Sequence, residues 1–179
     1  KLSLEEGRFV RRDAMSGMRG QNSNGKPRLL IVDDEEMVLT SIRSFLELED
    51  NYHIDSYTDP RQALDHVRQN SLDLVIADYL MPHMEGIEFL TQVRALRPEA
   101  TRILLTGYAD KESAIRAINQ VGLFQYIEKP WVNNQLLLII RNGLEKRFLV
   151  KRLREKISEL DEAHSGLKEV QKKLLQAFI

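Results

Sequence analysis

Four short stretches of the sequence carry side chains whose types suit one kind of chemistry. They are the acid pair Asp33-Asp34, the acid Asp78, the hydroxyl of Thr106 and the ammonium of Lys129. Carboxylates gathered in one place repel each other, and an oxygen-ligated divalent cation such as Mg²⁺ offsets that repulsion. Asp78 could then attack phosphorus, while Lys129 and Thr106 bind phosphoryl oxygens. The residue types therefore favour phosphoryl transfer to an aspartate, provided the fold brings them together.

Each stretch follows a run of residues that is typical of a strand in a parallel sheet. Such runs occupy residues 29–32, 53–57, 72–77, 102–105 and 123–127. Helical patterns alternate with them, around residues 37–46, 60–69, 86–96, 111–119 and 132–147. Five β/α units predict an α/β fold with a five-stranded, doubly wound parallel sheet. Because functional groups collect at the carboxyl ends of such strands, we expect the four stretches to meet there.

Composition narrows the chemistry further. The sequence has no cysteine and only 4 histidines, which excludes disulfide scaffolds, thiolate metal sites and cysteine catalysis. No apolar run approaches the roughly 20 residues of a transmembrane helix, so we expect a cytoplasmic protein that does not enter a membrane. Residues 28–147 hold 19 acidic and 13 basic side chains, a balance that disfavours contacts with nucleic acid.

The two ends of the chain differ from its middle. Residues 1–27 lack sustained periodicity, so we expect a flexible leader, either native or left from expression. In residues 148–179, positions spaced by three and four residues form a heptad seam: Val150, Leu153, Ile157, Leu160, His164, Leu167, Gln171, Leu174 and Phe178. This seam predicts a coiled coil that continues the last helix. We prefer self-association through it to a single helix folded back onto the domain.

In order and spacing, the sequence resembles the receiver domain of two-component response regulators. The residues that carry the resemblance are Asp33-Asp34, Asp78, Thr106 and Lys129-Pro130. The resemblance covers residues 28–147 and implies a flavodoxin-like sheet with strand order 2-1-3-4-5. Met81-Pro82 and Gly86 also resemble the family's loop after its phosphorylated aspartate.

The resemblance implies a role for each of the three aspartates, Asp33, Asp34 and Asp78. Asp78 would be the phosphoacceptor. Asp33 and Asp34 would hold Mg²⁺, together with Asp78 itself and the backbone carbonyl of Leu80. In this reading the chain is a phosphorylated signalling module and not an enzyme in its own right.

The resemblance also implies a switch. Thr106 would hydrogen-bond the phosphoryl group, Lys129 would pair with it, and Tyr126 would change rotamer as Thr106 moves. The added charge would bias the face formed by helix four, strand five and helix five. The change would pass through helix five and the coiled coil of residues 148–179 to an output domain outside this chain.

The same resemblance implies partners. A histidine kinase or a phosphotransfer protein would donate the phosphoryl group, and the chain would form a homodimer through its C-terminal helix, the helix four–strand five–helix five face, or both. Residues 105–131 more finely resemble receivers attached to cyclic-dinucleotide phosphodiesterase outputs of the HD-GYP type, or to sensor-kinase and phosphatase outputs.

Two other functions stay open at this point. An aspartate-nucleophile phosphohydrolase of the haloacid-dehalogenase type would use a second acid two residues after Asp78, but this chain has Leu80 there. A dimerisation scaffold that is never phosphorylated is the other alternative. His164 lacks the acid and the later Thr-Pro pair that follow the phosphorylated histidine of sensor kinases, so we interpret it as a polar heptad position.

Overall fold

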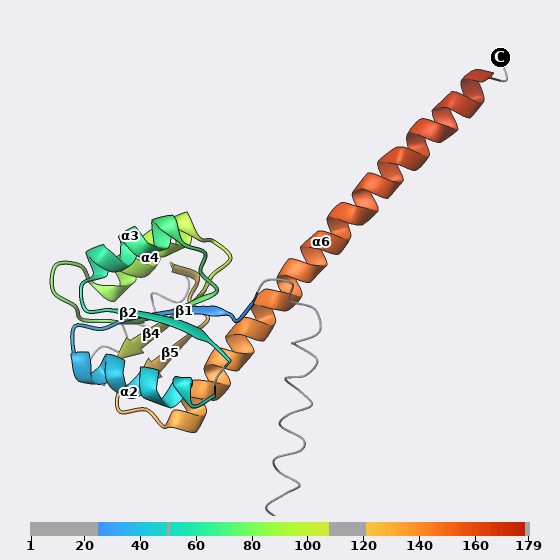
Figure 1. The fold of residues 1–179 in the computed structure, drawn as a ribbon. Coiled ribbons are helices and arrows are strands. Elements are labelled where there is room, and N and C mark those ends of the chain that lie inside the picture. The colour runs from blue at the N-terminus through green and yellow to red at the C-terminus, as the bar shows by residue number, and fades with distance from the viewer. Residues whose placement is uncertain (1–24, 50, 108–120, 178–179) are drawn as a thin grey trace, which may run out of the picture.

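The computed structural model describes residues 25–49, 51–107 and 121–177. Five strands are present: β1 (Arg28–Val32), β2 (His53–Tyr57), β3 (Leu74–Asp78), β4 (Thr101–Thr106) and β5 (Gln125–Glu128). Among the described residues, four helices alternate with them: α2 (Glu36–Glu47), α3 (Pro60–Gln69), α4 (Gly86–Leu96) and α6 (Asn133–Ala177) (Figure 1). The helix expected at residues 111–119 and nearly all of the expected leader lie outside the described residues.

The five strands form one parallel sheet in the order β2-β1-β3-β4-β5. Neighbouring strands pair in register, with Val32 opposite Tyr57 on one side and opposite Ala77 on the other. This topology confirms the predicted α/β fold and its strand order. In it, the carboxyl ends of β1 and β3 lie next to each other at the centre of one sheet edge.

Helices cover both faces of the sheet, because successive strand residues point to opposite sides. On one face Leu30, Val32 and Leu104 pack with the buried side chains of α3 and α4. On the other, Leu29 and Ile31 pack with those of α2 and the first part of α6. The two resulting cores, one on each side, explain why the central strands are apolar at nearly every position.

Local signals fix the start of α3. Pro60 occupies the first turn, where its missing N–H costs no hydrogen bond. Asp59 caps the helix, since its side chain accepts a hydrogen bond of 2.9 Å from the backbone N–H of Arg61. Both ends of this helix agree with the expected residues 60–69.

Helix α6 is a single helix of 45 residues, which at a rise of about 1.5 Å per residue spans roughly 68 Å. Its first part packs on the sheet through the buried side chains of Leu136, Leu137 and Ile140. It then passes residue 147 without interruption and projects away from the domain (Figure 1). The predicted continuation of the last helix beyond the domain is therefore present.

A close contact sets the angle at which α6 leaves the sheet. The hydroxyl of Thr101, at the start of β4, donates a hydrogen bond of 2.9 Å to the carbonyl of Gly143. A Cβ atom at Gly143 would lie 2.7 Å from the methyl carbon of Thr101, so only glycine permits this approach. Further along, Arg147 forms an ion pair of 2.6 Å with Asp73, the residue just before β3.

Within the described ranges, no helix combines the length and the apolar character required to cross a membrane.

Candidate functional site

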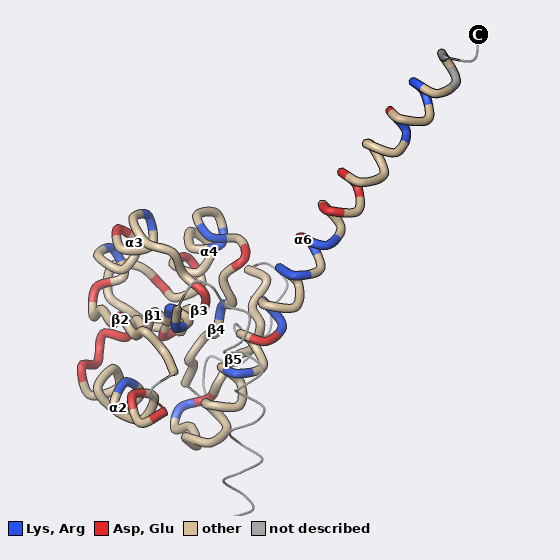
Figure 2. The backbone as a smooth tube through the Cα atoms, turned by 45° about the vertical axis from the view of Figure 1, so that its right-hand side comes forward, with Lys and Arg blue, Asp and Glu red and all other residues tan. Residues whose placement is uncertain are grey.

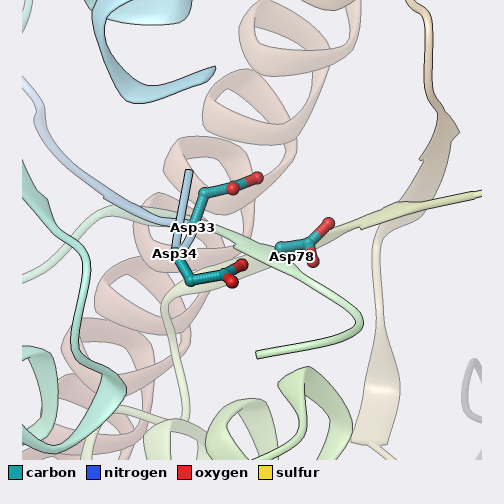
Figure 3. A group of neighbouring side chains, drawn as sticks. All are labelled: Asp33, Asp34 and Asp78. Carbon is teal, nitrogen blue, oxygen red and sulfur yellow. The ribbon is translucent and has the colours of Figure 1, made fainter. Parts of the chain in front are cut away.

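The sheet brings the three aspartates together at its carboxyl edge. Asp33 and Asp34 follow the last residue of β1, and Asp78 is the last residue of β3, the strand paired beside it. One carboxylate oxygen from each of the three lies within 4.8 Å of the others. Figure 3 shows the three side chains rising from the two strand ends into the same space. The convergence expected from the sequence is thus present for the acidic set.

Lys129 reaches this cluster from the end of β5. Its backbone N–H donates a hydrogen bond of 2.9 Å to the carbonyl of Thr106, which fixes the residue against the end of β4. Its Nζ atom lies 2.7 Å from Oδ2 of Asp33 and 2.7 Å from Oδ1 of Asp78, and 4.0 Å from a carboxylate oxygen of Glu35. One ammonium therefore bridges two of the three aspartates.

Burial and charge act in opposite directions on these groups. The side chain of Asp33 is fully buried, and burial raises the pKa of its carboxyl group even though hydrogen bonds from Lys129 and the Glu35 N–H lower it. Burial alone would lower the pKa of Lys129, but its hydrogen bonds to Asp33 and Asp78 outweigh that effect and raise it. The lysine is therefore held in its charged form, while the carboxylate at Asp33 bears a desolvation cost.

Backbone N–H groups orient the two bridged carboxylates. Oδ1 of Asp33 accepts a hydrogen bond of 2.9 Å from Glu35, and Oδ2 of Asp78 accepts one of 3.1 Å from Leu80. Asp34 is exposed, whereas Asp78 keeps only 6% of its surface accessible. The cluster therefore combines two buried carboxylates, at Asp33 and Asp78, with one exposed carboxylate at Asp34.

Thr106 ends β4, the strand beside β3, and Tyr126 lies on β5; among the described residues neither side chain hydrogen-bonds a carboxylate of the cluster. Thr106 is fully buried at the end of β4, and its hydroxyl donates a hydrogen bond of 3.1 Å to the carbonyl of Gly107. Tyr126, on β5, is half-buried and packs against the core on the α3–α4 side. Thr106 thus lies at the expected carboxyl edge of the sheet, whereas Tyr126 lies opposite Leu104, two residues before that edge. The switch roles of both stay predictions.

Two further residues shape the site. Gly86 begins α4, and a Cβ atom there would lie 2.0 Å from the carbonyl oxygen of Asp78, so glycine lets the helix abut the end of β3. Sequence reasoning noticed Gly86 only as part of a loop pattern. It assigned no role to Glu35, whose N–H orients Asp33 and whose carboxylate lies near Lys129. The sequence does place Glu35 directly after Asp33-Asp34, and this position could have indicated that it belongs to the site.

This arrangement suits the handling of a phosphoryl group. Asp78 offers a nearly buried carboxylate, and Lys129 supplies a cation in direct contact with it. Asp33, Asp34 and Asp78 offer oxygen ligands only, which is the donor set that Mg²⁺ prefers. Of the described residues that could hold a metal, these three form the one group with suitable spacing.

Comparison with known proteins identifies the family to which the chain belongs. The family model of the response regulator receiver domain matches residues 29–141. The chain belongs to this family. The match spans β1 to the first turns of α6, so it includes every residue of the acidic cluster and Lys129.

Curated relatives of this receiver domain are regulatory proteins. The chain is 35% identical over 127 residues to the hydrogenase transcriptional regulatory protein HoxA of Cupriavidus necator, an alignment that covers 71% of the chain and 26% of that protein. It is 36% identical over 141 residues to the transcriptional regulatory protein FlgR of Helicobacter pylori, covering 78% and 36%. The chain thus spans about a quarter to a third of the length of these relatives.

Solved structures show the same receiver fold. The signal receiver domain of an HD domain-containing protein from Pseudomonas fluorescens has a TM-score of 0.65 and 34% identity, covering 69% of this chain and 98% of that one. The solution structure of the beryllofluoride-activated NtrC4 receiver domain dimer has a TM-score of 0.63 and 30% identity, covering 67% and 98%. The fold and the family are therefore those predicted.

Proposed function

We propose that this receiver domain accepts a phosphoryl group on Asp78 from a phosphorylated histidine of a partner kinase or phosphotransfer protein. The observation that carries the proposal is the position of Lys129, whose ammonium bridges Asp33 and Asp78 at 2.7 Å from each. A cation already in contact with the reactive carboxylate can pair with the charge that a phosphoryl group brings. Sequence similarity to regulatory proteins supports the same role.

In the transfer, a carboxylate oxygen of Asp78 forms the new P–O bond. The P–N bond to the donor imidazole breaks, and its electron pair stays on the donor nitrogen. The N–H of Leu80 holds one oxygen of Asp78 at 3.1 Å and so orients the attacking carboxylate. Lys129 then pairs with a phosphoryl oxygen in place of part of its contact with Asp78. Positioning and charge stabilisation account for most of what such a transfer requires.

We propose Mg²⁺ as the cofactor, held by Asp33, Asp34, Asp78 and the backbone carbonyl of Leu80. When bound, the ion would neutralise charge on the carboxylates and on the phosphoryl oxygens. The fit rests on the carboxylate spacing of 4.8 Å or less and on the burial of Asp33, which leaves an ionised group poorly solvated. Asp34, which is exposed, is the ligand nearest to solvent.

The signal would leave the site through β4, β5 and α6. Thr106 would turn its hydroxyl from Gly107 toward the phosphoryl group, and Tyr126 would follow by changing rotamer. We propose that the altered face and α6 govern homodimerisation, and that α6 carries the change to an output domain. That output could be of the HD-GYP type, since one structural neighbour is named as the receiver of an HD domain-containing protein.

Two alternatives predict different chemistry. In a haloacid-dehalogenase-type hydrolase, an acid two residues after the nucleophile would protonate the leaving group. Leu80 occupies that position here, with an apolar side chain that is 56% exposed. This favours a phosphoaspartate that persists over one that turns over. In a scaffold that is never phosphorylated, the bridge from Lys129 to Asp33 and Asp78 would serve stability alone.

Labelling with a small-molecule phosphate donor and Mg²⁺ tests the proposal. Phosphoramidate should label the chain to about one phosphate per molecule, and Asp78→Asn should remove the label. Continuous release of phosphate with many turnovers would instead indicate the hydrolase. Beryllofluoride with Mg²⁺ addresses the scaffold: unchanged spectra and unchanged self-association would favour that alternative.

A further inference from the structure

The outer half of α6 carries an apolar stripe that faces solvent. Five apolar side chains along it are between 50% and 68% exposed: Leu153, Ile157, Leu160, Leu167 and Leu174. They recur in steps of three, four and seven, so they fall on one side of the helix. Figure 2 shows basic and acidic residues interspersed along the same projecting segment. A helix with an apolar side and charged flanks in water is stable when a partner covers that side.

The contacts within α6 do not cover the stripe. Lys156 pairs with Glu159 at 2.6 Å, and Lys173 pairs with Glu169 at 3.0 Å. Both are ion pairs between exposed groups along the surface of a single helix, so they bury no apolar side chain. Every described side chain from residue 151 to 174 is exposed. The domain of the same chain therefore does not cover the stripe in the part that the structure describes.

We propose that this stripe pairs with the same stripe of a second copy of the chain, in parallel and in register. The inference rests on the homodimer within the proposed function and assigns its geometry. Leucines occupy the d positions and Ile157 an a position of the heptads, a pattern that favours parallel two-stranded coiled coils. A second copy supplies a stripe of matching length and spacing.

Two polar residues in the seam decide between orientations. His164 and Gln171 occupy successive a positions, both exposed in the single chain. In a parallel, in-register pair each meets its own copy, so polar groups face polar groups. In an antiparallel pair a positions face d positions, and each polar side chain would be buried against a leucine. Because burying an unpaired polar group is costly, the polar layers select the parallel register.

Charges beside the seam agree with this orientation. In a parallel pair, a residue at position g lies near position e of the following heptad on the other helix. Lys156 then lies near Asp161 of the partner subunit, and the symmetric contact forms on the other side. Both side chains are exposed in the single chain, where Lys156 pairs with Glu159 and would exchange that contact for one across the seam.

The domain sets where the pairing begins. Val150, the first position of the heptad pattern, is only partly exposed and lines a small cavity beside the loop after α4. Arg154 forms an ion pair with Glu99 of that same loop. These contacts engage the helix on its own domain, so the free stripe starts at Leu153. The seam expected from Val150 is therefore shortened by one position.

Single-cysteine variants test the geometry, because the natural sequence has no cysteine. His164→Cys and Gln171→Cys each introduce a thiol into the seam without removing an apolar contact. Glu162→Cys and Glu169→Cys, each two residues earlier and on the outer side, are the matched controls. Each variant is equilibrated in a glutathione redox buffer, and interchain disulfide is measured on non-reducing gels.

We expect both seam variants to form interchain disulfide at least tenfold more than their controls. In an antiparallel pair a residue meets its own copy only at the midpoint, so disulfide at one seam position alone would overturn the proposal. Disulfide at neither seam position would overturn it too. Phosphoramidate labelling of the same variants separates the two proposals. Labelling without disulfide would contradict only the pairing. Disulfide without labelling would contradict only the phosphoacceptor role.

Discussion

The Nζ atom of Lys129 lies 2.7 Å from Oδ1 of Asp78. The same atom contacts Asp33 at 2.7 Å, so a single cation is shared by two buried carboxylates that come from different strands. Such a bridge links β5 to β1 and β3 at the edge of the sheet. It also places positive charge beside Asp78, the residue that we propose as phosphoacceptor, so stability and chemistry depend on the same contact.

Replacing Lys129 with methionine should lower the free energy of unfolding by about 1–3 kcal/mol in metal-free buffer, because two buried carboxylates lose their shared partner. Urea unfolding measures the loss. Lys151→Met is the control: that lysine is exposed on α6, so its replacement should change stability by less than about 0.5 kcal/mol. Equal unfolding midpoints for Lys129→Met and the wild type would contradict the importance of the bridge.

Replacing Asp33 with asparagine should stabilise the metal-free protein at neutral pH. Burial raises the pKa of Asp33, so its ionised form is less favourable in the folded chain than in the unfolded one. That penalty is fully present above the folded-state pKa and fades as the pH falls through it toward the ordinary value of 3.8.

Urea unfolding of Asp33→Asn and wild type over a pH series should therefore show an advantage for the variant that shrinks on acidification. The exposed Asp161→Asn on α6 serves as the control and should show no such trend. If the stability advantage of Asp33→Asn over the wild type grew as the pH fell, the prediction would be contradicted.

Mg²⁺ should raise the melting temperature of the wild type, because a ligand that binds only the folded state stabilises it. At a concentration one hundred times its dissociation constant the gain is about 2.7 kcal/mol. The Asp33→Asn variant should respond much less, since it lacks one proposed ligand. Thermal melts with and without Mg²⁺ measure the difference. A wild type that melts at the same temperature in both buffers would count against the metal site.

Gly86→Ala should destabilise the domain and slow labelling of Asp78. The added Cβ atom would lie 2.0 Å from the carbonyl oxygen of Asp78, so α4 or the end of β3 must move. Gly166→Ala is the matched control, because nothing lies within 4 Å of its Cβ position on α6. There alanine should stabilise the helix by up to about 1 kcal/mol. Normal labelling and normal stability in Gly86→Ala would refute the role given to this contact.

Sequence patterns predicted the sheet and most of its helices, because apolar runs and caps are local features. The bounds of β2, α3 and α4 agree with those expected, and the cap of α3 is a hydrogen bond between near neighbours, from the Arg61 N–H to Asp59. Strand starts were less accurate. β3 begins at Leu74 instead of Leu72, since a strand starts where a neighbour offers hydrogen bonds and not where apolar residues start.

Other features depend on contacts between distant parts of the chain. The sequence placed Lys129 at the right edge of the sheet, but only the packing of β5 beside β4 brings its ammonium between Asp33 and Asp78. Likewise, nothing local indicates that Val150 would lie against the domain while Leu153 faces solvent. Side-chain direction is decided by tertiary structure, which periodicity alone does not specify.

The site of phosphorylation is the most direct test of the central claim. After incubation with phosphoramidate and Mg²⁺, reduction with borohydride converts an acyl phosphate into a stable alcohol that marks the residue in peptide mass spectra. We predict one modified residue, Asp78, and no modification when phosphoramidate is omitted. Modification at Asp33 or Asp34, or none at Asp78 under conditions in which a known receiver is modified, would contradict the account.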